Sequence, residues 1–308
     1  MVIPVIFKVL IVGLLPYDSG KTTLAMGLIA GLRRLGYKIT PFKPISAHNW
    51  YTQYNATIVG MKYGIPLSED IIKLVEAAEV NERFEILNPV DSVTAPLNPG
   101  AFWDWHSPSS FYTYASNFFR QVLVSRISFI LSDNRIVNYG FLNKFSIEKR
   151  LIIFQPEVLS RITRKLGKIE KVEKISFLAE ILASNSMPAI EHSLDYLKNK
   201  YRVVAIESFN DAAWPLPRNE SVDVVVAVAP GQALIYDPEK YKLAVFLREH
   251  VMKPYKGAVL CDIFDLIKPI ERIEVPPVSY GILPDSIADK LDRLVGIVSD
   301  EIEKKNQK

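Results

Sequence analysis

The sequence predicts an α/β protein with a doubly wound, mostly parallel sheet flanked by helices. Short apolar runs rich in β-branched residues, such as Val5 to Val12 and Val222 to Val228, are typical of strands covered on both faces. Between these runs, apolar residues recur at helical spacing, as in Tyr241 to His250 and in the terminal stretch from Ile287 to Glu303. This alternation of strand and helix favours a parallel sheet with crossover helices.

The composition is that of a globular chain. With 308 residues, of which 49% are hydrophobic and 23% charged, the chain can bury a large core. Cys261 is its single cysteine, which excludes an intrachain disulfide and points to a reducing, cytoplasmic location. The apolar start is interrupted by Lys8, is too short to span a bilayer and has no small-residue cleavage site, so we expect a buried strand there and no membrane partner.

The strongest chemical signal follows the first predicted strand. A short polar loop leads directly into a helical pattern that begins near Leu24, so backbone amides at the helix start would face an anion. Gly20 would let the backbone approach phosphates closely, Lys21 would neutralise the β- and γ-phosphates, and the Thr22 hydroxyl would ligate Mg²⁺. The predicted nucleotide-binding residues are Asp18, Ser19, Gly20, Lys21, Thr22 and Thr23.

This loop departs from the usual Walker A pattern G-x-x-x-x-G-K-[ST]. The first glycine of that pattern falls at Leu15, whereas Gly13 lies two residues earlier. A loop entered through Gly13 could still curl around a phosphate, because the amides of residues 18–23 do most of the cradling. The alternative is a chance Gly-Lys-Thr at an ordinary helix start, and the strand before the loop and the helix after it favour the phosphate loop.

A second strand, Tyr37 to Phe42, ends at Lys43, and this edge of an open α/β sheet faces the ligand crevice. Lys43 is therefore a candidate catalytic residue together with Lys21, in contact with a phosphate or a substrate carboxylate; the alternative is a solvated surface lysine. A polar, aromatic loop follows, whose residues either bind substrate or form an aromatic cap on the core. Its candidate substrate-binding residues are His48, Asn49, Trp50 and Tyr51.

The apolar stretch Val203 to Ile206 ends in Glu207. A buried strand with an acid at its end is the arrangement that holds Mg²⁺ beside a phosphate loop, so Glu207 is the predicted metal partner of Thr22. The alternative is an acid at a strand end with no metal role. A further buried strand is expected from Ala258 to Cys261.

The middle of the chain, residues 103–186, is predicted to be an insertion into a core formed by residues 1–102 and 187–308. Residues 85–108 are rich in Pro and Asn and have no period, which predicts an ordered loop on the surface or over the site. The insertion contains two apolar runs around Ser132-Asp133-Asn134, which predict a hairpin, and then helical patterns over Pro156 to Leu166 and Val172 to Leu182. Another helix is expected from Ala189 to Leu197. Between residues 113 and 176 there are twelve basic and five acidic residues, an excess of seven positive charges. This excess indicates either an anionic partner such as nucleic acid or solvated helix faces.

Several stretches, taken in order, resemble the dethiobiotin synthetase family and its cobyrinate amidase relatives within the P-loop NTPases. They are "YDSGKTT", "GYKITPFKP", "LNPVDSVTAP", "VVAIES" and "YGILP". The resemblance implies Lys21 on the phosphates, Thr22 and Glu207 on Mg²⁺, and Lys43 near phosphate and substrate. The chain departs from the family in lacking an acid after the Lys-Pro strand and in its long middle segment. The loop alone also resembles polynucleotide kinases related to messenger-RNA processing factors.

Together, these observations predict a Mg²⁺-dependent ATPase (a hydrolase) or an ATP-dependent kinase or ligase that transfers a phosphoryl group to a small molecule. The alternative is a nucleotide-dependent switch that binds RNA or DNA, or a polynucleotide 5′-hydroxyl kinase, using the basic segment. A third interpretation is a slowly hydrolysing nucleotide-binding protein that assembles with a partner. No N-K-x-D motif favours guanine, so GTP stays open beside ATP, as does a homodimer.

Overall fold

The computed structural model describes residues 6–251, 257–279 and 281–307, and the chain divides into two compact units. Unit 1 contains residues 1–44, 73–82 and 194–308, and unit 2 contains residues 45–72 and 83–193. Each unit has its own sheet and helices. Within the described part of the chain, every helix is too short or too polar to cross a membrane.

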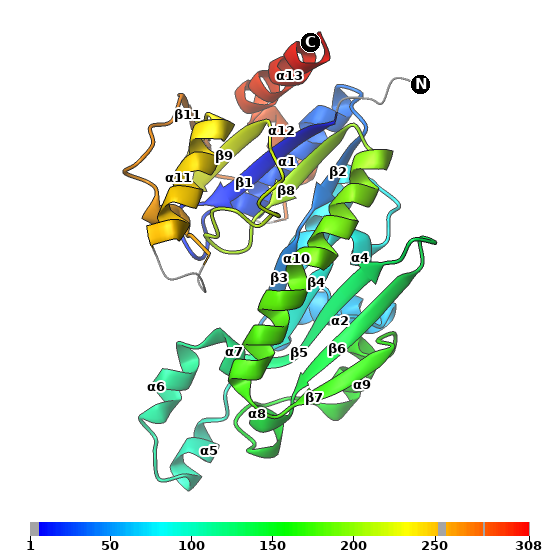
Figure 1. Ribbon diagram of the computed structural model, residues 1–308, viewed down its shortest axis with the longest axis vertical. Helices are drawn as coiled ribbons and strands as arrows, with labels where there is room; N and C mark the ends of the chain where they lie inside the picture. The colour runs from blue at the N-terminus through cyan, green and yellow to red at the C-terminus, as the bar shows by residue number, and fades with distance from the viewer. Residues whose placement is uncertain (1–5, 252–256, 280, 308) are drawn as a thin grey trace. The chain divides into compact units, whose positions relative to one another are not determined.

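The sheet of unit 1 is mixed, with strand order β11-β10-β9-β1-β8-β2 in the described residues (Figure 1). Strands β9, β1, β8 and β2 run parallel to one another, whereas β10 and β11 are antiparallel additions at one edge. All seven residues of β1 are buried, as expected for a central strand. The strands are β1 (Phe7–Gly13), β2 (Ile39–Phe42), β8 (Val203–Glu207), β9 (Val224–Ala229), β10 (Gln232–Tyr236) and β11 (Glu271–Glu274).

Helix α1 (Lys21–Arg34) packs its apolar side on this sheet. Leu24, Leu28 and Leu32 belong to one buried cluster with side chains of β1, β8 and β9. The same cluster includes residues of α12 (Pro284–Asp289) and α13 (Asp292–Asn306), so α1 is held between the sheet and the C-terminal helices. Helix α11 (Pro238–Val251) and a 3₁₀ turn at Leu260–Asp262 complete the helical elements that lie wholly in unit 1.

Unit 2 is built on a second mixed sheet with strand order β3-β4-β5-β6-β7. Its strands are β3 (Ile45–Asn49), β4 (Val90–Thr94), β5 (Val122–Ile130), β6 (Ile136–Asn143) and β7 (Lys168–Val172). Its helices are α2 (Tyr54–Tyr63), α4 (Phe84–Leu87), α5 (Pro99–Asp104), α6 (Ser110–Ala115), α7 (Phe118–Gln121), α8 (Lys144–Glu148) and α9 (Pro156–Ile162). Two further helices, α3 (Glu69–Ala78) and α10 (Ile175–Lys200), contribute residues to both units.

The two faces of the unit 2 sheet have different cores. On one face, Leu178, Ile181 and Leu182 of α10 join apolar residues of β4, β5 and β6. On the other face lies a buried polar layer, in which Arg126 is fully buried and donates to the Asn88 backbone oxygen at 2.8 Å. Burial lowers the pKa of Arg126, and the nearby charges of Asp91 and Glu85 oppose this shift. Arg126 is thus a structural residue of unit 2, and its charge is not available at the surface.

The prediction of an α/β fold with helices flanking a sheet is confirmed, and so is the hairpin around Asp133, which is β5–β6. The domain boundary lies elsewhere than predicted: unit 2 begins at Ile45, because β3 and β4 pair with each other and β4 pairs with β5. The predicted insertion, residues 103–186, lies within this unit. Val5, the predicted first residue of β1, lies outside the described residues.

Four local predictions were wrong. The polar, aromatic loop expected after Lys43 contains β3, which pairs with β4. The Pro- and Asn-rich stretch after α4 contains β4, whose short Val-Asp-Ser-Val-Thr run gains its strand character from pairing with β5. The two helices expected between Val172 and Leu197 are one helix, α10, which continues through Pro188. Ala258 to Cys261 is not a strand of the sheet but leads into a 3₁₀ turn, with a single bridge from Val259 to Ala212.

Candidate functional site

The loop between β1 and α1 is shaped by two residues with positive φ. Asp18 has φ of 52° and Gly20 has φ of 88°, a conformation that glycine adopts without strain. Gly20 is the N-cap of α1, and its carbonyl oxygen accepts the Leu24 amide at 3.0 Å. Helix α1 thus begins directly after Gly20, and the backbone amides at the start of a helix form the kind of donor cluster that binds anions.

Gly13 lets the side chain of Lys21 cross the end of β1. A Cβ atom on Gly13 would lie 2.8 Å from both Lys21 Nζ and Ser19 Oγ, and Lys21 Nζ donates to Ser19 Oγ at 3.1 Å. Leu15, which stands where the usual pattern has glycine, is 44% exposed. In this loop, close approach of other side chains is thus made possible by Gly13 and not by the residue at position 15.

Glu207 lies at the centre of a buried polar cluster at the carboxyl ends of β8 and β2. Its Oε1 accepts from Thr22 Oγ1 at 3.0 Å and from Lys43 Nζ at 2.5 Å, and Lys43 Nζ also donates to the Ser208 backbone oxygen at 3.1 Å. The side chains of Lys43 and Glu207 are 2% and 1% exposed. Lys43 is therefore not a solvated surface lysine: it belongs to the same cluster as the start of α1.

The sheet order explains why these residues meet. β8 lies between β1 and β2 and runs parallel to both, so the carboxyl ends of the three strands are at one edge of the sheet. Glu207 ends β8, Lys43 follows β2, and Thr22 stands in the first turn after β1. Residues separated by more than 160 positions in the sequence are thereby brought into hydrogen-bonding distance.

The donor set at this cluster suits a hard cation. Thr22 offers a hydroxyl oxygen and Glu207 a buried carboxylate, which are ligand types that Mg²⁺ prefers. Among the described residues, no group of three or more His, Cys, Asp or Glu side chains could hold a metal ion by itself. A cation here would therefore depend on oxygens that phosphate groups and water supply, as Mg²⁺ does when it binds with a nucleotide.

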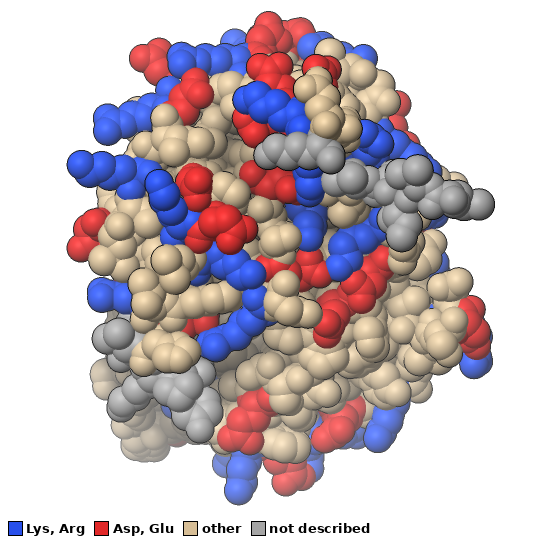
Figure 2. Space-filling view, turned by 45° about the horizontal axis from the view of Figure 1, so that its top comes forward, with Lys and Arg blue, Asp and Glu red and all other residues tan. Residues whose placement is uncertain are grey.

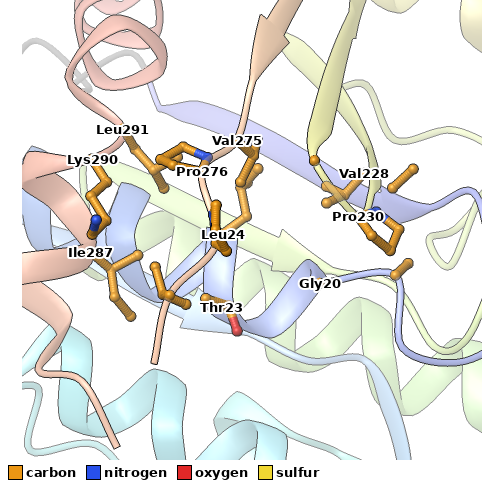
Figure 3. Close-up of a pocket in the computed structure, with 15 residues that line it drawn as sticks. Gly20, Thr23, Leu24, Val228, Pro230, Val275, Pro276, Ile287, Lys290 and Leu291 are labelled. Carbon is orange, nitrogen blue, oxygen red and sulfur yellow. The ribbon is translucent and has the colours of Figure 1, made fainter. Parts of the chain in front are cut away.

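A cavity of about 300 Å³ opens beside the start of α1 (Figure 3). Gly20, Thr23 and Leu24 line it from α1, and Val228 and Pro230 from the end of β9. The remaining wall comes from the segment 275–278 and from α12, including Pro276, Ile287 and Lys290. Sequence reasoning missed this cavity, although the Ala229-Pro230-Gly231 turn after an apolar strand and the Pro276-Pro277 pair were visible signals.

The four predicted substrate-binding residues belong to unit 2. His48 and Trp50 are buried, and the Trp50 indole nitrogen donates to the Ile153 backbone oxygen at 2.8 Å. The Asn49 side chain accepts the Tyr51 amide at 3.0 Å, and Tyr51 itself is 65% exposed. His48, Asn49 and Trp50 thus have structural contacts within unit 2. The site residues that the structure brings together are those of unit 1.

Charges of both signs are intermixed on the face shown in Figure 2, without a large area of one sign. Comparison with protein-family models, with curated proteins and with solved structures found no match for this chain.

Proposed function

We propose that unit 1 is a P-loop NTPase core that binds a nucleoside triphosphate with Mg²⁺ and transfers its terminal phosphoryl group to a small molecule or to water. The observation that carries the proposal is the cluster at the start of α1, where Lys21, Thr22, Lys43 and Glu207 converge. The cluster combines a helix start of the kind that binds anions with two buried lysines, Lys21 and Lys43. It also contains two hard oxygen donors, the Thr22 hydroxyl and the Glu207 carboxylate.

In this function the phosphates lie along the loop from Asp18 to Thr23. The amides of the first turn of α1 donate to phosphate oxygens, and Lys21 leaves Ser19 to neutralise the β- and γ-phosphates. Thr22 and Glu207 hold Mg²⁺, which supplies charge neutralisation at the phosphate oxygens when it is bound. The ion pair with Glu207 holds the Lys43 ammonium group at the carboxyl edge of the unit 1 sheet. There the ammonium group stabilises negative charge on the phosphoryl group that is transferred.

The cavity beside α1 would take the nucleobase. It begins at Gly20 and Thr23, where the phosphate chain ends, and continues between apolar side chains of β9, the 275–278 segment and α12. Apolar walls suit a flat base, because the base is buried by packing on both faces. We propose ATP as the ligand, with GTP as the alternative for the binding measurement to decide.

The resemblance to dethiobiotin synthetases supports a small-molecule acceptor such as a carboxylate. It does so through the same residues that converge in unit 1, namely the "YDSGKTT", "FKP" and "VVAIES" stretches. The single cysteine of the chain remains in keeping with a reducing, cytoplasmic setting.

The proposal is tested by calorimetric titration of the full chain with ATP and with GTP, each with Mg²⁺ and with EDTA. We expect binding of at least one triphosphate that weakens in EDTA, and a loss of about tenfold or more in affinity in Lys21→Ala, because a charge-assisted contact is removed. The matched control is Lys304→Ala, a lysine of α13 that is 65% exposed and pairs with Glu301. This control should bind like the wild type.

Two results would contradict the proposal: neither triphosphate binds to folded protein, or Lys21→Ala and Lys304→Ala bind equally well. Release of inorganic phosphate or of ADP, measured with and without candidate carboxylate acceptors, then separates hydrolysis from transfer.

A further inference from the structure

The buried polar layer of unit 2 contains two neighbouring side-chain atoms that have no hydrogen-bond partner among the described residues. They are Nδ1 of His48, in β3, and Oδ1 of Asp91, in β4. The two atoms are 3.8 Å apart, and the side chains of His48 and Asp91 are 1% and 0% exposed. This separation is too long for a direct hydrogen bond, and buried polar atoms are rarely left without a partner.

Strand pairing brings these side chains to one face of the unit 2 sheet. Ser46 of β3 pairs with Asp91 in the register of β3 and β4, and Asp91 pairs with Arg126 of β5. His48 lies two residues after Ser46, so the two side chains share that face. The other carboxylate oxygen of Asp91, Oδ2, accepts from Ser46 Oγ at 2.7 Å and from the Ser68 amide at 2.8 Å. The open hydrogen-bonding position of Asp91 is therefore at Oδ1, beside His48.

The contacts of Thr57 indicate which nitrogen of His48 carries the hydrogen. Thr57 Oγ1 lies 3.3 Å from His48 Nε2 and 3.1 Å from the Trp50 backbone oxygen, and its single hydrogen can serve only one of them. Because a carbonyl oxygen can only accept, the hydroxyl donates to Trp50 and accepts the hydrogen of His48 Nε2. In the neutral imidazole, Nδ1 is then an acceptor, and its neighbour Asp91 Oδ1 is an acceptor as well.

Two neighbouring acceptors require a hydrogen-bond donor between them. A water molecule has two hydrogens and can donate one to each atom, and internal waters typically bind such buried groups. Ser68 Oγ is a third buried atom without a partner among the described residues, and the Ser68 amide already donates to the same carboxylate. A cation is disfavoured, because the fully buried Arg126 already provides positive charge near Asp91.

We propose that the polar layer of unit 2 binds an internal water molecule that donates to His48 Nδ1 and to Asp91 Oδ1. A separation of 3.8 Å lets one water oxygen lie at about 2.8 Å from both atoms. The proposal assigns His48 a role in the core of unit 2. It is independent of nucleotide binding by unit 1, because all the residues of the water site belong to unit 2.

A crystal structure of the full chain, at a resolution that shows ordered water, tests the proposal directly. We expect electron density for one water oxygen at about 2.7–3.2 Å from both His48 Nδ1 and Asp91 Oδ1. The proposal is overturned if no density lies between the two atoms, or if they approach each other closely enough for a direct hydrogen bond.

Nitrogen-15 NMR of the His48 imidazole tests the donor assignment in solution. We expect the hydrogen on Nε2 and none on Nδ1 at neutral pH. Hydrogens on both nitrogens would overturn the proposal, because the imidazolium itself would then supply the donor that faces Asp91.

Oxygen-17 magnetic relaxation dispersion counts long-lived internal waters in solution. We expect His48→Phe to hold one water fewer than the wild type, because the larger phenyl ring has no acceptor and extends toward Asp91. The matched control is His106→Phe, an exposed histidine of the same unit, which should leave the count unchanged. An unchanged count in folded His48→Phe would contradict the proposal. If His48→Phe does not fold, as judged by circular dichroism, the crystal structure and the NMR measurement of the wild type decide.

Discussion

Gly13 and Lys21 show how a single missing side chain can decide the shape of a site. Lys21 crosses the end of β1 only because Gly13 has no Cβ: that atom would also lie 3.0 Å from the backbone oxygen of Asn210. The loop after β8 therefore closes over the same position. Since the Asn210 contact is with backbone, a methyl group at position 13 could be accommodated only by moving the side-chain ends of Lys21 and Ser19.

We predict that Gly13→Ala weakens binding of Mg²⁺ and ATP by about tenfold or more, because the methyl group displaces Lys21 from the phosphate-facing position. The measurement is the calorimetric titration described above, on protein whose circular dichroism matches the wild type. Gly296→Ala, at a helical glycine with open space around it, is the control and should bind normally. Equal affinity of Gly13→Ala and wild type would show that Lys21 does not need this path.

The ion pair of Lys43 and Glu207 is buried on both sides, so its loss should affect stability as well as function. Removing one partner leaves a buried charge without its counter-ion, which typically costs about 3–5 kcal/mol. We predict such a loss in the free energy of unfolding for Lys43→Met. The double variant Lys43→Met/Glu207→Gln should recover part of it, because both charges are then absent.

Urea unfolding of the wild type, of Lys43→Met, of Glu207→Gln and of the double variant measures the coupling energy between Lys43 and Glu207. If the effects of the two single variants simply add, Lys43 and Glu207 are not energetically coupled in the folded chain. The double variant should nevertheless bind Mg²⁺ and ATP poorly, since it lacks the carboxylate proposed to hold the metal.

At the scale of elements, the close packing of α1 against α12 depends on a small residue. A Cβ atom on Gly27 would lie 2.6 Å from Ile287 Cγ2, 2.7 Å from Leu291 Cδ1 and 3.2 Å from the Ile287 carbonyl carbon. Alanine favours helix over glycine by up to about 1 kcal/mol, but overpacking typically costs about 1–3 kcal/mol. Because one of the contacts is with the backbone of α12, we expect the cost of overpacking at position 27 to exceed the gain in helix propensity.

We therefore predict that Gly27→Ala lowers the free energy of unfolding, whereas Gly296→Ala raises it by about 0.5–1 kcal/mol, because Gly296 of α13 has open space around it. Both substitutions are glycine to alanine inside a helix, so the difference in sign isolates the packing contribution. Urea unfolding monitored by circular dichroism measures it. Stabilisation by both substitutions would show that α12 can move away from α1 without cost.

For the whole molecule, each unit has a buried carboxylate whose pKa is held low. In unit 1, burial raises the pKa of Glu220, but hydrogen bonds from Lys198 and Lys8 outweigh it, and the pKa lies below its ordinary value of 4.5. In unit 2, burial likewise acts to raise the pKa of Glu85, and the Arg83 hydrogen bond and the charge of Arg126 bring it below 4.5. Each carboxylate stabilises its unit while it is ionised.

A carboxyl group with a lowered pKa in the folded state contributes its full stabilisation above pH 4.5 and loses it as the pH falls through the folded-state pKa. We predict that Glu220→Gln lowers the free energy of unfolding by about 1.5–3 kcal/mol at pH 7, and that the difference from wild type shrinks below pH 4.5. Urea unfolding between pH 7 and pH 3 measures this. A constant difference over that range would mean that Glu220 does not act through its charge.

The sequence predicted much of unit 1 and little of unit 2. The signals for unit 1 are local in the sequence, so they can be recognised without knowledge of the fold. They are the continuous apolar run that includes Val9 and Ile11, the helical spacing of Leu24, Leu28 and Leu32, and the Gly-Lys-Thr between them. The short β4 and the continuous α10 were missed, because β4 depends on its pairing with β5, and Pro188 is held within a helix packed on the sheet. The boundary at Ile45 was missed for the same reason.

By itself, the sequence determined the α/β class and the residue types at the ends of the first, second and eighth strands, and it carries the Gly-Lys-Thr on which the proposal of a phosphate-binding loop rests. Tertiary structure alone decided that Lys43 and Glu207 form a buried pair with Thr22 beside them, that Gly13 leaves room for the Lys21 side chain at the end of β1, and that unit 2 has a sheet of its own. The physical reason is that strand order and side-chain burial arise from contacts between distant segments, which residue spacing does not encode.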